Sequence, residues 1–314
     1  PIELADQIAQ VATIIRPQTD KRRQEFTITA YHIVHEHLIG DSVRLRQVFL
    51  NLLSNAVKYT PEGGKIRLSL AELPCGTGRA EFLISVSDTG CGMTQEFIGH
   101  IFEPFTRAEN SVTNRVQGTG LGMAITKHFI DLMGGEINIT SEVGKGSCFD
   151  VRLSMDINEN AHSSADIHSV LLISHNSVLI QNISASLTHA DIELRSSYDA
   201  ERADTSGADV ILVSDEGCGA DLPGIMTALR SSADKNALLI CISDDYVYTD
   251  NAISCSGADG EIPLPFFMTN LERCVKSIRE KSSRRTDDTS VLRGLKFLCA
   301  EDTELNAEIL SGIL

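Results

Sequence analysis

The sequence predicts an α/β protein built in successive parts, and three observations lead to that class. Residues 1–157 mix amphipathic helical patterns with alternating strands. Residues 168–281 alternate short apolar strands with helix-like stretches, the pattern of a doubly wound parallel sheet. Two stretches poor in apolar residues, Met155–His168 and Arg279–Ser290, have the composition of linkers, the second before a short third part, residues 292–314.

The order of the elements follows from local signals. Asp41 is placed to cap a helix, because the apolar residues after it recur at the three- and four-residue spacing of a buried helical stripe. A second helix should end at Gly134-Gly135. The other expected elements are strands near 66–70, 81–87, 136–141 and 147–153, that second helix over 121–133, and buried strands at 170–173, 210–213 and 238–242.

Charge and cysteine usage exclude several classes of protein. The 314 residues carry a formal net charge of −16, and residues 156–290 contribute −12 of it, with 10 basic against 22 acidic side chains. This charge would repel nucleic acid, and no run of 18 apolar residues is present, so we expect no nucleic-acid partner and no membrane contact. The eight cysteines include no Cys-x-x-Cys pair, so metal-ligand spacing is missing. Because the chain begins at Pro1 without Met, we expect a piece of a longer protein.

Three polar side chains share one face of the helix after Asp41. In NLLSNAVKYT, Asn51, Asn55 and Lys58 stand at i, i+4 and i+7, opposite the apolar stripe. Two amide oxygens and one ammonium on one face suit a hydrated Mg²⁺ and a polyphosphate. A solvated helix face is the alternative, but asparagine is a poor residue for a helix interior, so propensity does not explain the pair.

Two glycine-containing motifs follow. In SDTGCGM, Asp88 ends an alternating strand, where its carboxylate can accept a hydrogen bond from the exocyclic amine of adenine and Gly90 and Gly92 let the backbone approach the base. A simple Asp-x-Gly turn is the alternative. QGTGLGM, residues 117–123, leads into a helix N-terminus, whose free amides favour phosphate. It does not follow a strand, which argues against a Rossmann site.

In their order and spacing, these motifs resemble the N, G1, F and G2 boxes of sensor histidine kinases, which belong to the Bergerat-fold ATPases. The resemblance covers residues 1–157 and implies an α/β sandwich, with a mixed sheet, helices on one face, and ATP held between helices and a lid. It implies that Asn55 holds Mg²⁺ with Asn51 close by, that Lys58 contacts phosphate and that Asp88 binds the adenine amine. The other residues it assigns to the nucleotide are Tyr59, Gly90, Gly92 and Ser147 near the adenine, Phe102 and Phe105 in the lid, and Gln117, Gly118, Thr119, Gly120, Leu121 and Gly122 around the phosphates.

One position separates kinases from the hydrolytic members of this wider family. Those members place a glutamate, the general base for water, four residues before the Mg²⁺-binding asparagine, and here that position is Asn51. An amide has no useful basicity, so we expect slow hydrolysis. The family's phosphoacceptor histidine is not expected in this chain, because His35-Glu36 lies only 16 residues before Asn51, in an alternating stretch that predicts a strand.

Residues 168–281 resemble a response-regulator receiver of flavodoxin-like fold whose chemistry has been lost, a pseudo-receiver. A working receiver holds an acidic pair, an acceptor aspartate and a lysine where this sequence has Ser174 with His175, Ser214 and Leu264, and only the hydroxyl position, Ser243, is kept. Without carboxylates there is no Mg²⁺ site to activate a phosphoryl group.

Residues 292–314 resemble the start of a second receiver, in which Glu301 and Asp302 would be the metal-binding acidic pair. We therefore expect the ATP-binding catalytic and pseudo-receiver portion of a hybrid sensor histidine kinase. Its expected partners are a dimerisation domain outside this chain, which carries the acceptor histidine, a receiver, and a downstream phosphotransfer or response-regulator protein. Its expected location is the cytoplasm, or the cytoplasmic side of a membrane-bound sensor. A non-catalytic nucleotide-binding scaffold and a Bergerat-fold ATPase are the alternatives.

Overall fold

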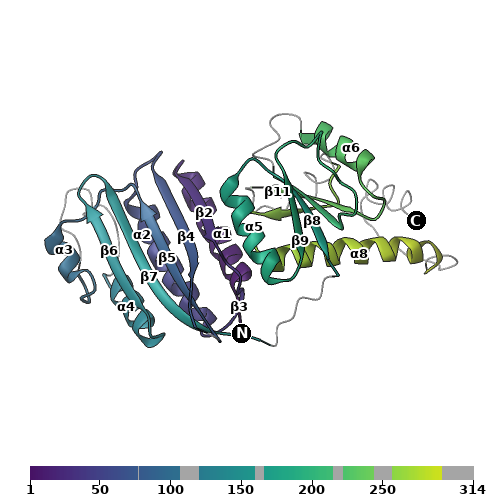
Figure 1. The fold of residues 1–314 in the computed structure, drawn as a ribbon. Coiled ribbons are helices and arrows are strands. Elements are labelled where there is room, and N and C mark those ends of the chain that lie inside the picture. Colours follow the sequence, from purple (N-terminus) through teal and green to yellow (C-terminus); the bar gives the residue numbers. More distant parts are fainter. Residues whose placement is uncertain (77, 107–119, 160–165, 215–221, 244–256, 292–314) are drawn as a thin grey trace, which may run out of the picture. The chain divides into compact units, whose positions relative to one another are not determined.

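The computed structural model describes residues 1–76, 78–106, 120–159, 166–214, 222–243 and 257–291, the last ten of these by backbone only. The chain forms two compact units, Pro1–Val275 and Lys276–Leu314. The first unit contains two separate sheets (Figure 1). Among the described residues, no helix combines the length and the apolar character that crossing a membrane requires.

The mixed-sheet part, residues 1–157, holds a seven-stranded sheet in the order β1-β3-β7-β5-β4-β2, with β6 pairing with β7. Strands β2 and β4 are parallel and the other pairs are antiparallel, so the sheet is mixed as predicted. The strands are β1 (Ile2–Glu3), β2 (Glu25–Tyr31), β3 (His37–Ile39), β4 (Lys65–Leu73), β5 (Arg79–Asp88), β6 (Glu136–Glu142) and β7 (Gly146–Ile157).

Helices α1 (Leu4–Lys21), α2 (Ser42–Tyr59) and α4 (Gly122–Leu132) lie on one face of this sheet, and a short α3 (Gln95–His100) lies near β6 (Figure 1). The predicted cap of α2 is confirmed, because Asp41 Oδ1 accepts from the amides of Val43 and Arg44 at 3.1 and 3.0 Å. The whole predicted apolar stripe of α2 is buried between helices and sheet. The remaining polar face of α2 is therefore free to carry a site.

The parallel-sheet part, residues 169–275, contains five strands in the order β12-β11-β10-β8-β9, all parallel. Numbered along this part, the order is 2-1-3-4-5, that of flavodoxin-like folds. The central strands are continuous buried runs, as expected where helices cover both faces. The elements are β8 (Ser169–Ile173), α5 (Ser177–His189), β9 (Glu193–Ser197), β10 (Val210–Ser214), α6 (Leu222–Ser232), β11 (Leu238–Ser243), β12 (Gly260–Pro263) and α8 (Met268–Val291).

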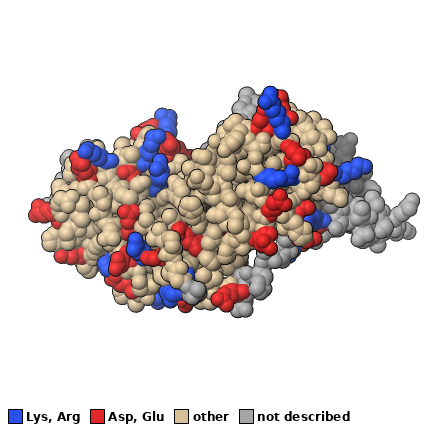
Figure 2. All heavy atoms as spheres, in the orientation of Figure 1, with Lys and Arg blue, Asp and Glu red and all other residues tan. Residues whose placement is uncertain are grey.

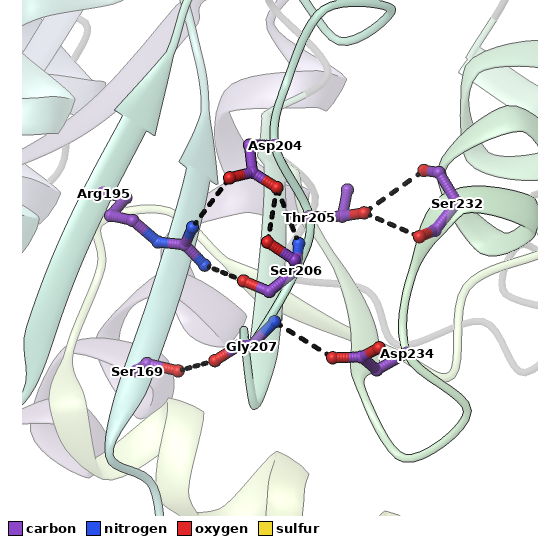
Figure 3. Close-up of polar contacts among 8 residues, drawn as sticks. All are labelled: Ser169, Arg195, Asp204, Thr205, Ser206, Gly207, Ser232 and Asp234. Atoms are coloured by element: carbon purple, nitrogen blue, oxygen red, sulfur yellow. Dashed lines mark hydrogen bonds and ion pairs between the residues drawn. The ribbon is translucent and has the colours of Figure 1, made fainter.

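Side chains fasten the turn before β10 to the amino-terminal edge of this parallel sheet (Figure 3). Asp204 accepts from both the amide and the hydroxyl of Ser206, at 3.1 and 2.6 Å. The Gly207 amide donates to Asp234 at 3.0 Å, and its carbonyl accepts from the Ser169 hydroxyl at 2.6 Å. The polar groups of this edge are thus satisfied within the fold itself.

Two expectations for local structure are wrong. The polar stretch Arg279–Ser290 lies in helix α8, which continues to Val291, because a helix without an apolar stripe has the same composition as a linker. His35 and Glu36 lie in an irregular segment between β2 and β3, not in a strand. There the amides of Val34 and His35 donate to Glu72 at 2.7 and 3.0 Å. The Glu72 side chain thus accepts the backbone hydrogen bonds that a neighbouring strand would otherwise accept.

The end of β2 and the irregular segment after it make polar contacts with α5 and α8. Asn182 on α5 donates to the Ala30 carbonyl at 2.5 Å, and Ser186 donates to the Ile33 carbonyl at 2.8 Å. The buried carboxylate of Glu36 accepts from the amides of Met268 and Thr269, at 2.5 and 2.9 Å, at the start of α8. Burial raises the pKa of Glu36, and these hydrogen bonds oppose that shift.

Candidate functional site

The amide side chains of α2 face the start of α4. Asn51 Nδ2 lies 3.4 Å from the Gly122 carbonyl and 3.2 Å from Thr126 Oγ1, while Asn55 Nδ2 lies 3.2 Å from the sulfur of Met123. Thr126 was not expected in the site, although its place one helical turn after Gly122 could have suggested it. Both asparagines use their nitrogen, so their oxygens are the atoms that a cation could meet.

The last turn of α2 joins this face to the SDTGCGM motif. The Lys58 ammonium lies 5.0 Å from the centre of the Tyr59 ring, so the two side chains stay together. The Tyr59 carbonyl accepts from the Cys91 amide at 3.3 Å. This hydrogen bond joins residues that are more than thirty positions apart, and it therefore ties the two motifs together.

Asp88 ends β5 with its carboxylate half-buried. The carboxylate accepts from the Gly90 amide at 2.8 Å and from the backbone of Ser147. Burial raises the pKa of Asp88 above its ordinary value, and the two backbone donors oppose the shift. A Cβ at Gly90 would lie 2.6 Å from Asp88 Oδ1 and 2.7 Å from the Tyr59 carbonyl oxygen, so glycine is required here.

A second close approach concerns a glycine that the motif analysis missed. Gly146 has φ +111°, and a Cβ there would stand 1.9 Å from the Asp88 carbonyl oxygen. Ser141 supports the same turn by donating to the Gly146 carbonyl at 2.9 Å and accepting from the Met93 amide at 2.9 Å, and its hydroxyl lies 3.0 Å from that of Ser147. The sequence GKGSCF, residues 144–149, could have indicated this glycine, because two glycines precede Ser147, the residue that the resemblance assigned to the site.

Two thiols beside this turn are held in their neutral form. Burial, with Asp150 as the next cause, raises the pKa of Cys148 to about 11. Burial also raises the pKa of Cys91, with Asp88 adding to the shift. Neutral thiols are poor nucleophiles and poor metal ligands, so neither cysteine competes with the amides and the carboxylate for a role in the site.

The lid residues lie partly within the described chain. Phe102 packs on the hydrophobic core, whereas the Phe105 side chain is 73% exposed and its amide donates to the Gly120 carbonyl at 3.2 Å. Leu121 precedes α4, which begins at Gly122. Gln117, Gly118 and Thr119, and also Glu301 and Asp302, lie outside the described residues.

The strand ends of the parallel sheet carry hydroxyls: Ser174 and Ser214 stand where a working receiver has carboxylates, and Ser243 stands at the position where a receiver also has a hydroxyl. Ser174 accepts from the Asn176 amide at 3.1 Å, and Ser243 pairs with Glu261. The hydroxyl of Ser214 is fully buried and has no hydrogen-bond partner among the described residues. His175 packs near the ring of Tyr198, with centroids 6.3 Å apart. Leu264 follows β12, and its amide donates to the Ser243 carbonyl at 2.8 Å.

Comparison with known proteins places the first of these sites in a family. Residues 40–157 match the family described as histidine kinase-, DNA gyrase B-, and HSP90-like ATPases. Sensor protein GacS of Pseudomonas syringae pv. syringae is 37% identical over 155 residues, which are 49% of this chain and 17% of that protein. The signal transduction histidine-protein kinase BarA of Escherichia coli K12 is 31% identical over 160 residues, 51% of this chain and 17% of that protein.

A solved structure extends the likeness of fold to both sheets. Full-length ShkA, crystallised in complex with AMPPNP, matches 100% of this chain and 64% of its own chain, with a TM-score of 0.51 and 23% identity. At that identity the likeness concerns the fold alone. The chain spans only 17% of the length of the curated relatives named above. Its residues 40–157 are a histidine kinase-type ATPase domain, homologous to those of the hybrid sensor histidine kinases.

Proposed function

We propose that residues 1–157 bind Mg²⁺-ATP and that the whole protein transfers the γ-phosphoryl group to a histidine of its dimerisation domain, and then to a receiver aspartate. The observation that carries the proposal is the meeting of three motifs at the ends of α2, β5 and α4. Asn51 bonds to Gly122 across the helices, and the Tyr59 carbonyl accepts from Cys91 after β5. The motifs belong to one site, not to three unrelated turns.

The residues present fit a nucleotide and its metal. The half-buried Asp88 carboxylate would accept from the adenine amine, with Gly90 leaving room for the base. Among the described residues, no group of three His, Cys, Asp or Glu is arranged to hold a metal. Mg²⁺ would therefore depend on the oxygens of Asn51 and Asn55 and on the phosphates, which suits a cation that keeps several waters. Bound there, Mg²⁺ would supply charge neutralisation along the polyphosphate.

The ATPase alternative needs a base at the position that Asn51 occupies. Asn51 stands where hydrolytic relatives have their glutamate, and its nitrogen is engaged by Gly122 and Thr126. We expect turnover by this chain far below about 1 per second, the lower end of ordinary enzyme rates. Phosphate release from fresh Mg²⁺-ATP measures it, and turnover of about 1 per second or faster would favour the ATPase.

A single experiment separates the kinase from a nucleotide-binding scaffold. The chain is mixed with a dimerisation domain that carries an acceptor histidine, and transfer of labelled phosphoryl from ATP is followed together with ATP binding. Asn55→Ala should abolish transfer, whereas Ser54→Ala, an exposed neighbour on the same helix, should not. ATP binding without transfer to any supplied histidine would favour the scaffold.

For the parallel-sheet part we propose regulation by contact and not by phosphorylation. Its strand ends bear Ser174 and Ser214, hydroxyls that cannot form the carboxylate site a receiver needs. The polar contacts of Asn182 and Glu36 supply an interface through which this part could change the activity of the kinase. A tenfold change in activity requires a difference in contact free energy of only about 1.4 kcal/mol between the two states. Acetyl phosphate with Mg²⁺ should add no phosphoryl mass to residues 168–281. Deleting them from the full-length kinase should change its autophosphorylation rate.

A further inference from the structure

The last turn of α2 is held by two side chains that no motif includes. An α-helix ends with four carbonyls that lack partners inside the helix. Arg22 Nη1 lies 2.8 Å from the Val57 carbonyl oxygen and 3.3 Å from that of Lys58. Gln24 Nε2 donates to the carbonyls of Val57 and Thr60, at 3.0 and 2.7 Å. The end of α2 is thus capped from another segment of the chain.

The turn that bears these two residues is shaped for the task. The amides of Arg22 and Gln24 both donate to the Thr19 carbonyl, at 3.0 and 2.9 Å, which closes the end of α1. Arg23 between them has φ +52°, a left-handed conformation that is uncommon for a residue with a Cβ. The reversal of the backbone at Arg23 lets its two neighbours reach the same helix end.

Gln24 makes this contact at a cost. It is buried, and its Oε1 has no hydrogen-bond partner among the described residues. A buried acceptor without a partner costs about 1–3 kcal/mol, and an apolar side chain of similar length would avoid it. The two hydrogen bonds that Gln24 Nε2 donates to the end of α2 offset this cost.

We infer that Arg22 and Gln24 are positioning residues for the nucleotide, acting through Lys58 and Tyr59. This inference rests on the proposed function, because those two residues are the nucleotide contacts at the end of α2. Asn51 and Asn55 lie further inside the helix, where its own hydrogen bonds hold them, whereas terminal turns fray unless capped. Loss of the cap would loosen Lys58 and Tyr59, and with them the Cys91 amide that bonds to the Tyr59 carbonyl.

Charge favours the same arrangement. Arg22 places a cation at the negative end of the α2 dipole. Lys21, Arg22 and Lys58 line one shallow groove of about 550 Å³ between the ends of α1 and α2. In a chain with a net charge of −16, three cations in one groove provide a local positive region beside the residue that would meet the phosphates.

The test compares matched variants by calorimetry with Mg²⁺-ATP. Arg22→Met should weaken binding about threefold and Gln24→Met about tenfold, whereas Arg23→Met, the same change at the intervening exposed residue, should stay within about twofold. In a Lys58→Met background the loss caused by Gln24→Met should shrink to about twofold, because residues that act through one another are not additive. Hydrogen exchange at residues 57–60 should rise in both cap variants.

The outcomes separate the proposed nucleotide binding from the positioning role of Arg22 and Gln24. If wild type and Arg23→Met bind no Mg²⁺-ATP, both the proposed function and the inference fail. If they bind and the cap variants bind equally well, or if the loss is fully additive with Lys58→Met, the inference alone is overturned. Should Gln24→Met fail to fold, Arg22→Met decides, because its side chain is exposed and its removal leaves the core intact.

Discussion

At the end of β5 in the mixed-sheet part, the carboxylate of Asp88 accepts from two backbone amides. At the end of β10 in the parallel-sheet part, the hydroxyl of Ser214 is buried with no hydrogen-bond partner among the described residues. Both strands are otherwise held by buried apolar residues in register with their neighbours. The difference teaches that buried apolar residues hold the interior of both strands alike, whereas the polar groups by which the two parts differ stand at the strand ends.

Charge shows the same contrast between the two parts. Figure 2 shows acidic and basic side chains interspersed over the face in view, without one large patch of either sign. The charges to which we assign a function are instead a few that lie at element ends, such as Asp88 and Lys58. In the parallel-sheet part, Asp204 and Asp234 lie at the opposite, amino-terminal edge of the sheet, where they fasten a turn (Figure 3). These two carboxylates therefore have a structural role.

The largest expected effect distinguishes a crowded turn glycine from an open one. Gly146→Ala in the mixed-sheet part would place a Cβ 1.9 Å from the Asp88 carbonyl oxygen, at φ +111°. We expect it to lower the free energy of unfolding by more than about 3 kcal/mol, because the β5–β7 pairing must shift, and to abolish ATP binding. Gly207→Ala in the parallel-sheet part meets open space at φ +66° and should cost only about 1 kcal/mol. Urea unfolding followed by circular dichroism measures both.

A control in the same turn separates crowding from backbone strain. Gly144 has φ +79°, and a Cβ there would meet nothing within 4 Å. Gly144→Ala should therefore resemble Gly207→Ala and not Gly146→Ala. Equal losses at Gly144 and Gly146 would mean that φ alone decides, and the close approach to Asp88 would lose its significance.

The next effect compares two aspartates that each accept two backbone amides. Asp88→Asn should weaken ATP binding by about 1.5–3 kcal/mol, because the amide replaces an acceptor by a group that can present its own nitrogen to the adenine amine. Asp209 in the parallel-sheet part accepts from the amides of His168 and Ser169, at 2.7 and 2.9 Å. Asp209→Asn should leave ATP affinity unchanged. Calorimetry checks both, and unchanged affinity in Asp88→Asn would remove the adenine assignment.

Much of the fold followed from local pattern. The apolar stripe and cap of α2 and the parallel order of strands were predictable, because they depend on periodicity and on residues close in sequence. The irregular segment at His35 was not predictable, because a carboxylate from Glu72, far along the chain, holds it. The continuation of α8 through residues 279–290 was not predictable either, because that stretch contains no apolar residue to mark a helix.

The candidate site divides in the same way. Asn51, Asn55 and Asp88 were predictable because each stands in a motif with its own spacing. Ser141 and Gln24 were missed, because their importance arises from partners 5 to 48 residues away that only the folded chain brings near. The roles assigned to single residues stay predictions, which nucleotide binding by the variants tests.

A smaller effect compares a satisfied hydroxyl with an orphaned one. Ser141→Ala removes a hydroxyl that bonds to Met93 and Gly146, and leaves those backbone groups without it, so we expect a loss of about 1–3 kcal/mol in unfolding free energy. Ser214→Ala removes a buried hydroxyl that has no partner in the described part of the chain, so stability should stay the same or rise by about 1 kcal/mol. A clear loss in Ser214→Ala would show that this strand end still uses its hydroxyl. Urea unfolding of the two variants decides.

The smallest effect is a dependence on pH that should act in opposite directions on binding and on stability. Burial raises the pKa of Asp88, so the folded protein holds that proton more tightly than the unfolded chain does. Its contribution to stability is therefore present below the ordinary pKa and is lost as pH rises through the raised one. ATP binding needs the ionised acceptor, so affinity should fall as pH is lowered through the same range, beginning at a higher pH than an ordinary aspartate would require. Calorimetry and urea unfolding give the binding and unfolding free energies of wild type and of Asp88→Asn at each pH. The difference between the two proteins isolates the titration of Asp88 from that of other groups. If both differences are flat between pH 7 and pH 4, Asp88 is not the titrating acceptor.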